Sequence, residues 1–340
     1  MNGKMMENQA KPVQKLAKQR SVIVEPTADV LKFFAALEEA GAPNFTELSI
    51  EQARKAYREQ SGIFGGATVE MAAVRDIIAD GPLGPIPLRL YRPHGLSRRP
   101  APALIYIHGG GWVIGDLDSH DRICRQLASR SGCAVVAVDY RLAPEHPAPA
   151  SSNDVIAAFW WIVANASTLD IDPDRIAIGG DSAGGSLSAV TAIAARNAGF
   201  PLCCQILIYP GTDNRKLAWG YPSRVRNAAM PPLTGEVMKY FLDIYLTDET
   251  IAADWRVSPL VVEQTAGLCP ALVITAGCDN LCDEGSLYAE KLEQAGVDVT
   301  RRVFSRMIHG FVELSGIVPE ASEAMDLIAL TLRQRLSATP

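Results

Sequence analysis

Short apolar runs, rich in β-branched residues, alternate with longer segments of helical length over most of the chain. Five runs are almost entirely apolar, as is typical of parallel strands that helices cover on both faces: ALIYI (103–107), AVVAV (134–138), RIAIG (175–179), QILIY (205–209) and ALVIT (271–275). The helix-length segments are 117–131, 152–166, 183–197 and 284–295. This alternation predicts an α/β fold with a mostly parallel sheet flanked by helices.

Three further runs extend the predicted sheet to eight strands. VRDIIAD (74–80) and IPLRLYR (86–92) flank the turn-rich GPLGP, which predicts an antiparallel hairpin. VTRRVF (299–304) predicts a late strand at the edge of the sheet. Because an edge strand can pair with a second copy across a two-fold axis, a homodimer and a monomer are both compatible with the sequence.

Two regions interrupt the alternation of strands and helices. Residues 1–60 have a helical composition and precede every predicted strand. Residues 211–255 separate two strands and contain TGEVMKYFLDIYL (234–246), whose apolar spacing predicts a helix. We expect both regions to form a helical cap over one end of the sheet, on a core made of residues 61–210 and 256–340.

The composition excludes several classes of function. A net charge of −6 gives no support for nucleic acid or an anionic membrane as partner. No stretch approaches the ~20 apolar residues of a membrane span. The seven cysteines are scattered in a chain without an export signal, which predicts reduced thiols and a cytoplasmic protein. The spacing of Cys278 and Cys282 is the one that most resembles a metal-binding motif. A zinc site usually needs four ligands, and only Cys269 lies close by in the sequence, so we predict no metal.

Ser182 in GDSAG (180–184) is the candidate nucleophile. It follows a predicted strand and opens a predicted helix, which is the context of a G-x-S-x-G nucleophile elbow. Gly180 and Gly184 leave room for the sharp turn. The alternative is a structural turn without chemistry. A serine hydroxyl is a weak nucleophile at neutral pH, so the hypothesis depends on a base nearby.

His309 is the candidate base. Where a serine lies on such an elbow, its partners follow along the chain as acid and then histidine. Of five histidines only His309 follows Ser182. It lies in MIHGF (307–311), just after the last predicted strand, where a loop can reach the carboxyl edge of the sheet.

Asp279 is the candidate acid, because it follows ALVITAGC at the carboxyl end of a predicted strand, where active-site groups of α/β sheets gather. The acid orients the imidazole and stabilises the imidazolium. Asp213, which follows QILIYPG, is the second candidate. Asp283 and Glu284 are better suited to begin the next helix, whose N-terminus favours acids.

HGGGW (108–112) follows the strand ALIYI and matches the HGGG-type loop that supplies backbone N–H groups to an oxyanion hole. Ala183, directly after the serine, supplies another. The alternative, a phosphate-binding loop, is disfavoured because the spacing is neither G-x-G-x-x-G nor that of a P-loop and no lysine follows.

With these residues in view, the chain resembles the hormone-sensitive-lipase family of α/β-hydrolases over about residues 70–315. The motifs occur in the family's order: HGGGW (108–112), DYRLAPEHPAPA (139–150), GDSAGG (180–185), DWRVSPL (254–260), DNLCDEG (279–285) and HGF (309–311). The resemblance implies a triad of Ser182, Asp279 and His309. It also implies oxyanion donors at Gly110, Gly111 and Ala183, and a cap built from the two regions described above.

Two features of these motifs lead to further expectations. The family commonly has D-P-L-x-D after the acid's strand, whereas this chain has Asn280 in place of the proline and Cys282 in the variable position. Because proline fixes φ, we expect a less constrained loop. In YRLAPE (140–145) we expect Arg141 and Glu145 to form an ion pair that braces the oxyanion side.

Together these features predict a serine carboxylesterase that acts on small-molecule esters of short- to medium-chain acids through an acyl-enzyme, without metal or cofactor. The alternatives are a lipase for long-chain esters and a hydrolase-like protein that only binds its ligand. The physiological substrate and the acyl-chain limit depend on how the cap is placed. Candidates for the pocket wall are Trp112, Trp219, Tyr209, Leu281 and Ile308.

Overall fold

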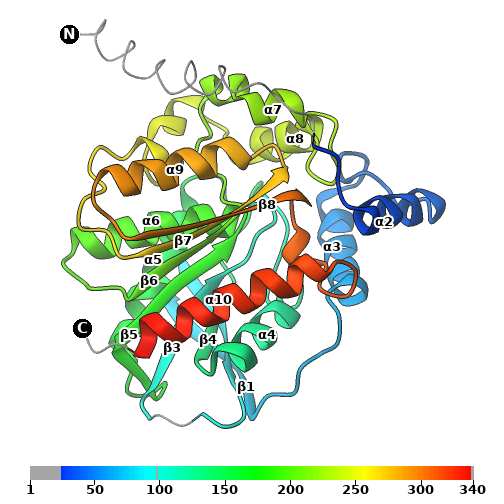
Figure 1. Cartoon of the computed structure of the whole chain (residues 1–340). Coiled ribbons are helices and arrows are strands. Elements are labelled where there is room, and N and C mark those ends of the chain that lie inside the picture. Colours follow the sequence, from blue (N-terminus) through cyan, green and yellow to red (C-terminus); the bar gives the residue numbers. More distant parts are fainter. Residues whose placement is uncertain (1–23, 97–98, 338–340) are drawn as a thin grey trace, which may run out of the picture.

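The computed structural model describes residues 24–96 and 99–337, and in it eight strands form one sheet in the order β1-β2-β4-β3-β5-β6-β7-β8 (Figure 1). The hairpin of β1 (Ala73–Gly81) and β2 (Gly84–Arg92) is antiparallel, and β2 pairs antiparallel with β4 (Ala134–Val138). All other pairs are parallel; their strands are β3 (Ala101–Ile107), β5 (Ile171–Asp181), β6 (Cys204–Ile208), β7 (Ala271–Cys278) and β8 (Val299–Ile308). The prediction of an eight-stranded, mostly parallel sheet is confirmed.

Helices cover both faces of this sheet (Figure 1). One face carries α4 (Asp121–Ser131) and α10 (Pro319–Ser337), and the other carries α5 (Ala150–Ala164), α6 (Ala183–Asn197) and α9 (Cys282–Gln294). Neighbouring side chains of β3 therefore enter opposite layers of the core. Leu104 packs with the α4 and α10 side and Ile105 with the α5 and α6 side. Because both faces are buried, the central strands are apolar throughout and do not alternate with polar residues.

The helix predicted from residue 117 begins later, at Asp121. The preceding residues form a loop in which the Asp116 carboxylate accepts hydrogen bonds from the backbone N–H groups of Asp118 and Ser119. An aspartate that bonds the backbone ahead of it competes with helical pairing, which explains the later start.

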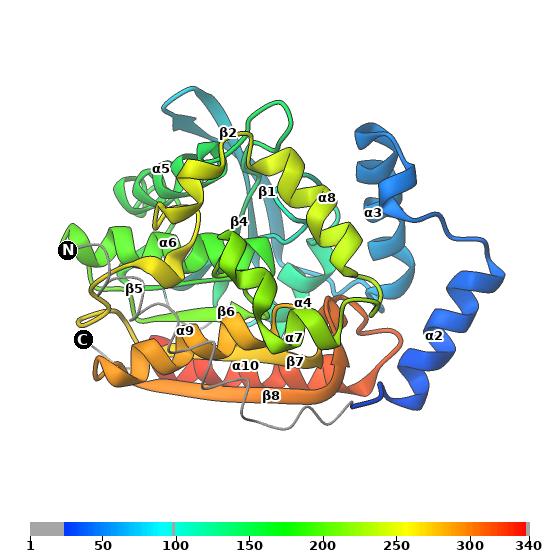
Figure 2. The same ribbon diagram turned by 90° about the horizontal axis from the view of Figure 1, so that it is seen from above.

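Two groups of helices gather at the end of the sheet where the parallel strands finish (Figure 2). The first consists of α2 (Ala28–Glu39), the 3₁₀ turn η1 (Phe45–Glu47) and α3 (Ile50–Phe64). A capping box begins α3, because Ser49 and Gln52 each accept a hydrogen bond from the other's backbone N–H. Residues 1–23 of the predicted N-terminal cap segment lie outside the described residues.

The second group lies between β6 and β7 and consists of η2 (Lys216–Gly220), α7 (Pro222–Arg226), α8 (Gly235–Tyr245), η3 (Glu249–Ala253) and η4 (Pro259–Val261). The predicted helix at 234–246 is α8. The groups meet where the ring of Phe45 lies 6.3 Å from that of Phe241. Within residues 24–96 and 99–337, no helix is both long enough and apolar enough to cross a membrane.

Candidate active site

Ser182 lies on a strained turn between β5 and α6. Its φ of 54° and ψ of −120° belong to a region that costs a non-glycine residue roughly 1–3 kcal/mol. The turn is tight on every side: a Cβ on Gly180 or Gly184 would overlap the carbonyl oxygen of Ile107. The chain therefore needs small residues on both sides of Ser182, and α6 directs its N-terminus at the hydroxyl.

The structure brings Ser182, His309 and Asp279 together from the carboxyl ends of three strands. Ser182 follows β5, Asp279 follows β7 and His309 follows β8. His309 Nε2 lies 2.8 Å from Ser182 Oγ, and His309 Nδ1 lies 2.9 Å from Asp279 Oδ2. The other oxygen, Oδ1 of Asp279, accepts a hydrogen bond of 2.9 Å from the backbone N–H of Leu281. A base thus lies within hydrogen-bonding reach of the serine and is itself oriented by a carboxylate.

The electrostatics around His309 favour its protonated form. Burial opposes protonation, but the charge and hydrogen bond of the Asp279 carboxylate, together with the charges of Glu313 and Asp181, outweigh it, so the pKa of His309 is raised. An imidazole in this setting can accept a proton from Ser182 and hold it.

The glycine loop, residues 108–115, lies against this centre. Gly110 and Gly111 have φ of 109° and 58°, conformations that side chains disfavour. The carbonyl oxygen of Gly110 accepts hydrogen bonds from Val113 and Ile114, which closes the loop into a turn. His108 stacks on Tyr140 at 4.3 Å between ring centroids, so it supports the loop from inside the core.

A cavity of about 160 Å³ opens onto Ser182 and His309. Gly110, Gly111, Ser182, Ala183 and His309 all line it. The two groups of helices described above, with the loop before α8, supply most of its apolar wall: Phe33, Leu37, Phe45, Phe64, Leu233, Val237, Met238, Phe241 and Leu242. The sequence offered five candidates for the pocket wall, and two of them, Trp112 and Leu281, line the cavity. The other three are not among the lining residues in the described part of the chain: Trp219, Tyr209 and Ile308.

The alternative acid, Asp213, is engaged elsewhere. Its carboxylate accepts two hydrogen bonds of 2.8 Å from Arg215 and one of 2.6 Å from Tyr221. The two carboxylates predicted to begin the next helix also have other partners. Asp283 accepts a hydrogen bond from the backbone N–H of Ser223, and Glu284 forms an ion pair with Arg224. Asp279 is the carboxylate that contacts His309.

The loop that carries Asp279 is held by the segment between β6 and β7. Asn280 is buried and its side chain donates to the carbonyl oxygens of Asn227 and Leu233. Asn227 donates in turn to the Asp279 carbonyl at 2.8 Å, and Ser223 to the Asn280 carbonyl at 2.8 Å. Side-chain hydrogen bonds therefore constrain this loop where the family has a proline ring.

The predicted ion pair between Arg141 and Glu145 is wrong. Arg141 forms a bidentate pair with Asp154 on α5, at 2.6 and 2.7 Å. Glu145 pairs with Arg54 on α3, at 2.7 and 2.8 Å. Closeness in sequence suggested the first pairing, but the segment turns so that the two side chains face different helices.

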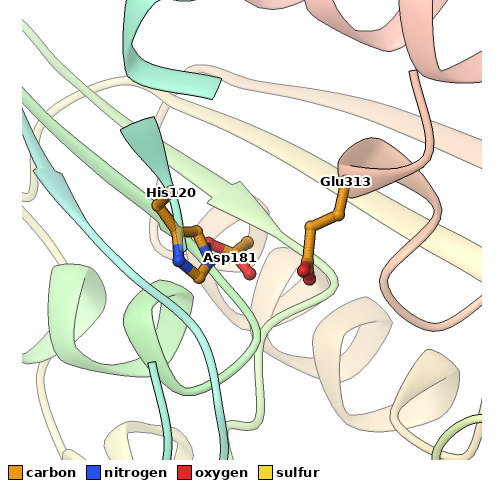
Figure 3. Close-up of side chains that lie close together, drawn as sticks. All are labelled: His120, Asp181 and Glu313. Carbon is orange, nitrogen blue, oxygen red and sulfur yellow. Dashed lines mark ion pairs between the residues drawn. The ribbon is translucent and has the colours of Figure 1, made fainter. Parts of the chain in front are cut away.

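A buried polar cluster beside the candidate nucleophile had no signal in the sequence. Three side chains converge there (Figure 3): His120 lies directly before α4, Asp181 ends β5, and Glu313 ends the 3₁₀ turn η5 (Phe311–Glu313). His120 Nε2 lies 3.4 Å from Asp181 Oδ1, and each partner shifts the pKa of the other against the effect of burial, downward for Asp181 and upward for His120. Both shifts favour the charged form of the group concerned.

Histidine and carboxylates also bind metals, so the cluster has to be tested as a metal site. Asp181 Oδ1 already accepts from the Tyr106 hydroxyl at 2.7 Å and from the Gly109 backbone N–H at 3.1 Å. The Gly109 N–H also lies 3.3 Å from His120 Nε2. Because Asp181 Oδ1 holds the Gly109 N–H at the start of the glycine loop, we interpret the cluster as a polar support beneath this loop.

Comparisons with known proteins agree with this fold and site. The family described as alpha/beta hydrolase fold matches residues 104–313. An ethyl acetate hydrolase of Pseudomonas putida is 38% identical, with 85% of this chain and 91% of that protein covered. The carboxylesterase NlhH of Mycobacterium tuberculosis is 42% identical, with 78% of this chain and 82% of that protein covered. A sheet of this order with a serine at a strand–helix turn defines the class as an α/β hydrolase.

Similar solved structures indicate which family of α/β hydrolases the chain belongs to. An ester hydrolase from the metagenome of Lake Arreo, solved with a derivative of a bipyridine phosphonate, is 39% identical at a TM-score of 0.87, covering 93% of this chain and 100% of that one. The chain belongs to the hormone-sensitive-lipase family of carboxylesterases, on the α/β-hydrolase fold.

Proposed function

We propose that this protein is a serine carboxylesterase that hydrolyses esters of short- to medium-chain acids through Ser182, His309 and Asp279. The observation that carries the proposal is the continuous set of contacts at the cavity floor, 2.8 Å from Ser182 Oγ to His309 Nε2 and 2.9 Å from His309 Nδ1 to Asp279. Serine and base are close enough for direct proton transfer.

The reaction has two halves. Ser182 Oγ attacks the ester carbonyl carbon while His309 Nε2 takes the hydroxyl proton, and Asp279 stabilises the imidazolium. Backbone N–H groups of Gly110, Gly111 and Ala183 bind the tetrahedral oxyanion. The C–O bond to the alcohol then breaks, and the alcohol leaves with the proton from His309. Water, deprotonated by the same imidazole, attacks the acyl-enzyme and releases the acid.

The relatives support ester hydrolysis as the reaction. One is named an ethyl acetate hydrolase and another a carboxylesterase. A phosphonate, as bound by the Lake Arreo ester hydrolase, has the tetrahedral shape of the intermediate proposed here. The small volume of the cavity at Ser182, about 160 Å³, supports short and medium acyl chains over long ones.

We propose that residues 1–60 and 211–255 act as the cap over a catalytic core of residues 61–210 and 256–340. Both regions contribute side chains to the cavity wall, with Phe45 from the first and Phe241 from the second. Substrate selection would then depend on residues outside the sheet. The cytoplasmic location and the homodimer stay predictions from sequence.

Replacing Ser182 by alanine tests the proposal. We expect turnover of p-nitrophenyl butyrate to fall by at least about 10⁴-fold, with unchanged thermal unfolding. Ser186→Ala, a buried serine of the same helix, is the matched control and should keep near wild-type activity. A phosphonate probe should add to Ser182 in the wild-type protein. Full activity in Ser182→Ala would overturn the proposed role.

Rates measured on esters of increasing acyl-chain length distinguish a carboxylesterase from a lipase. Rates on p-nitrophenyl acetate, butyrate, octanoate and palmitate should peak at the short or medium chains. Dominant palmitate hydrolysis would instead favour a lipase. A protein that binds these esters without turnover and without phosphonate labelling would be the hydrolase-like binding protein.

A further inference from the structure

The face of α3 that points at the active site is polar. Arg54, Tyr57, Arg58 and Ser61 occupy positions i, i+3, i+4 and i+7, so they share one side of the helix. A helix that served only as an apolar lid would present apolar side chains there. Each of the four instead makes a hydrogen bond to the core, and three of them reach the glycine loop or the loop residues that follow it.

Arg54 makes the most connections. Its Nε donates to the Val113 carbonyl at 2.9 Å, and its Nη2 donates to the Ala143 carbonyl at 3.0 Å. Both Nη1 and Nη2 donate to Glu145, at 2.8 and 2.7 Å. One guanidinium therefore ties the glycine loop to the segment after β4. The hydrogen bonds from Arg54 lower the pKa of Glu145 to about 2, so the pair stays ionised throughout the range of an esterase assay.

The two loops that Arg54 joins also bond to each other. The backbone N–H of Ala143 donates to the Trp112 carbonyl at 2.9 Å. Val113, whose carbonyl Arg54 holds, is in the turn that closes on Gly110. The position of the Gly110 and Gly111 N–H groups thus depends on a short stretch of backbone that is fixed from outside by Arg54.

The other side of this stretch is covered by α8. A Cβ placed on Gly111 would lie 2.8 Å from the ring of Phe241. Further along, Arg58 donates to Asp116 at 2.7 Å, and Ser61 donates to the Ser119 carbonyl. The glycine loop is held between the two cap regions, by hydrogen bonds from α3 and by packing from α8.

From these contacts we propose that Arg54 is a positioning residue for the oxyanion hole: by holding the Val113 and Ala143 carbonyls it sets where the Gly110 and Gly111 N–H groups point. Oxyanion donors act only within a narrow distance of the transition-state oxygen, and a misplacement of about 1 Å can cost roughly 100-fold in rate. The inference rests on the proposed esterase function. It assigns α3 a part in the chemical step in addition to its part in the cavity wall.

The decisive variant is Arg54→Met, which keeps the length of the stem and removes all donors. We expect kcat on p-nitrophenyl butyrate to fall by about 10- to 100-fold with KM changed by less than about threefold, because the oxyanion forms only after binding. The rate at which a p-nitrophenyl phosphonate adds to Ser182 should fall in parallel, since that step also builds negative charge at the oxyanion position.

Three matched variants separate positioning from charge and from fold stability. Lys55→Met changes the next residue of α3, whose side chain is 74% exposed and pairs with Glu59 of the same helix at 3.8 Å, and should behave like wild type. Glu145→Gln removes the ion pair but leaves both carbonyl contacts of Arg54, so kcat should change by less than about threefold. Arg54→Lys keeps the charge, but one ammonium cannot span the same carbonyls and carboxylate, so kcat should stay at least about fivefold low.

The outcomes are distinguishable. Wild-type kcat and phosphonylation rate in Arg54→Met, or a loss confined to KM, would overturn the proposal and leave α3 as a wall of the cavity. If Arg54→Met fails to fold, Arg54→Lys decides, and wild-type kcat in that variant would overturn the proposal. Failure of the esterase function itself would look different, because the wild-type protein would then neither turn over esters nor be labelled at Ser182.

Discussion

Tyr57 on α3 donates a hydrogen bond of 2.8 Å to Glu313, in the turn that follows His309. This contact joins the first cap region to the loop of the proposed base. Burial, together with the charge of Asp181, raises the pKa of Glu313 to about 7. The titratable groups that face it from neighbouring elements are Tyr57, His120, Asp181, Tyr209 and His309.

Glu313→Gln should move the pH profile. The negative charge of Glu313 helps to raise the pKa of His309, so removing this charge lowers the pKa of His309. His309 must be neutral to accept the serine proton, and activity is lost as the pH falls through its pKa. The acidic limb of kcat/KM should therefore shift to lower pH in the variant. Glutamine still offers an oxygen to Tyr57, which limits structural change.

The control for this profile is Glu323→Gln, whose exposed carboxylate pairs with Arg302 far from the cavity. Its acidic limb should coincide with that of the wild type. An unchanged limb in Glu313→Gln, or a shift to higher pH, would show that Glu313 does not act on His309.

Asp279→Asn and Asp213→Asn together test which acid orients His309. Asparagine at 279 loses the carboxylate that fixes the imidazole tautomer, and we expect kcat to fall by roughly 10⁴-fold in a folded protein. Asparagine at 213 disturbs contacts with Arg215 and Tyr221, so it should lower the unfolding temperature and leave the activity of the folded enzyme within a few-fold. The reverse pattern would assign the acid role to Asp213.

The parts that sequence predicted well are those set by local pattern. Central strands such as 103–107 are apolar because helices bury both of their faces, and that requirement is readable in five residues. The serine turn was equally readable, because its strained backbone demands small neighbours at Gly180 and Gly184. The order of acid and histidine after the serine follows from the order of the strands that carry them.

The parts that sequence missed depend on contacts between distant segments. Arg54 carries no local sign that it reaches Val113, Ala143 and Glu145, because those contacts exist only once α3 lies across two loops. The cluster of His120 and Glu313 around Asp181 is of the same kind. Long polar side chains have several partners within reach, and only the packed structure selects one.

Gly111→Ala should lower the activity of the folded enzyme. The residue has a φ of 58°, and an added Cβ would lie 2.8 Å from the Phe241 ring, so the glycine loop or α8 has to shift. We expect kcat to fall by at least about 10-fold, since two of the three proposed donors, Gly110 and Gly111, lie on that loop. Gly132→Ala is the control: its φ of 72° imposes similar strain, but nothing lies within 4 Å of the new Cβ.

Gly132→Ala should lose about 1 kcal/mol of stability, because it places alanine at positive φ, and Gly111→Ala should lose more, because its Cβ also displaces the loop or Phe241. Only Gly111→Ala should lose activity in the folded state, measured as kcat on p-nitrophenyl butyrate beside thermal unfolding. Equal activity in the two variants would mean that the glycine loop tolerates displacement and does not hold an oxyanion.

The corrected partner of Arg141 leads to a last prediction, about stability. Asp154 is almost fully buried and accepts three hydrogen bonds from Arg141, one from the backbone N–H and two from the guanidinium. Asp154→Asn removes the counter-charge of a guanidinium that is only 19% exposed, and we expect a loss of about 2–4 kcal/mol in the free energy of unfolding by urea. Glu145→Gln is the matched control, because that carboxylate is 53% exposed and its pair with Arg54 should contribute less than about 1 kcal/mol. Had Arg141 paired with Glu145, the larger loss would follow the Glu145 substitution, so the order of the two losses decides between the pairings.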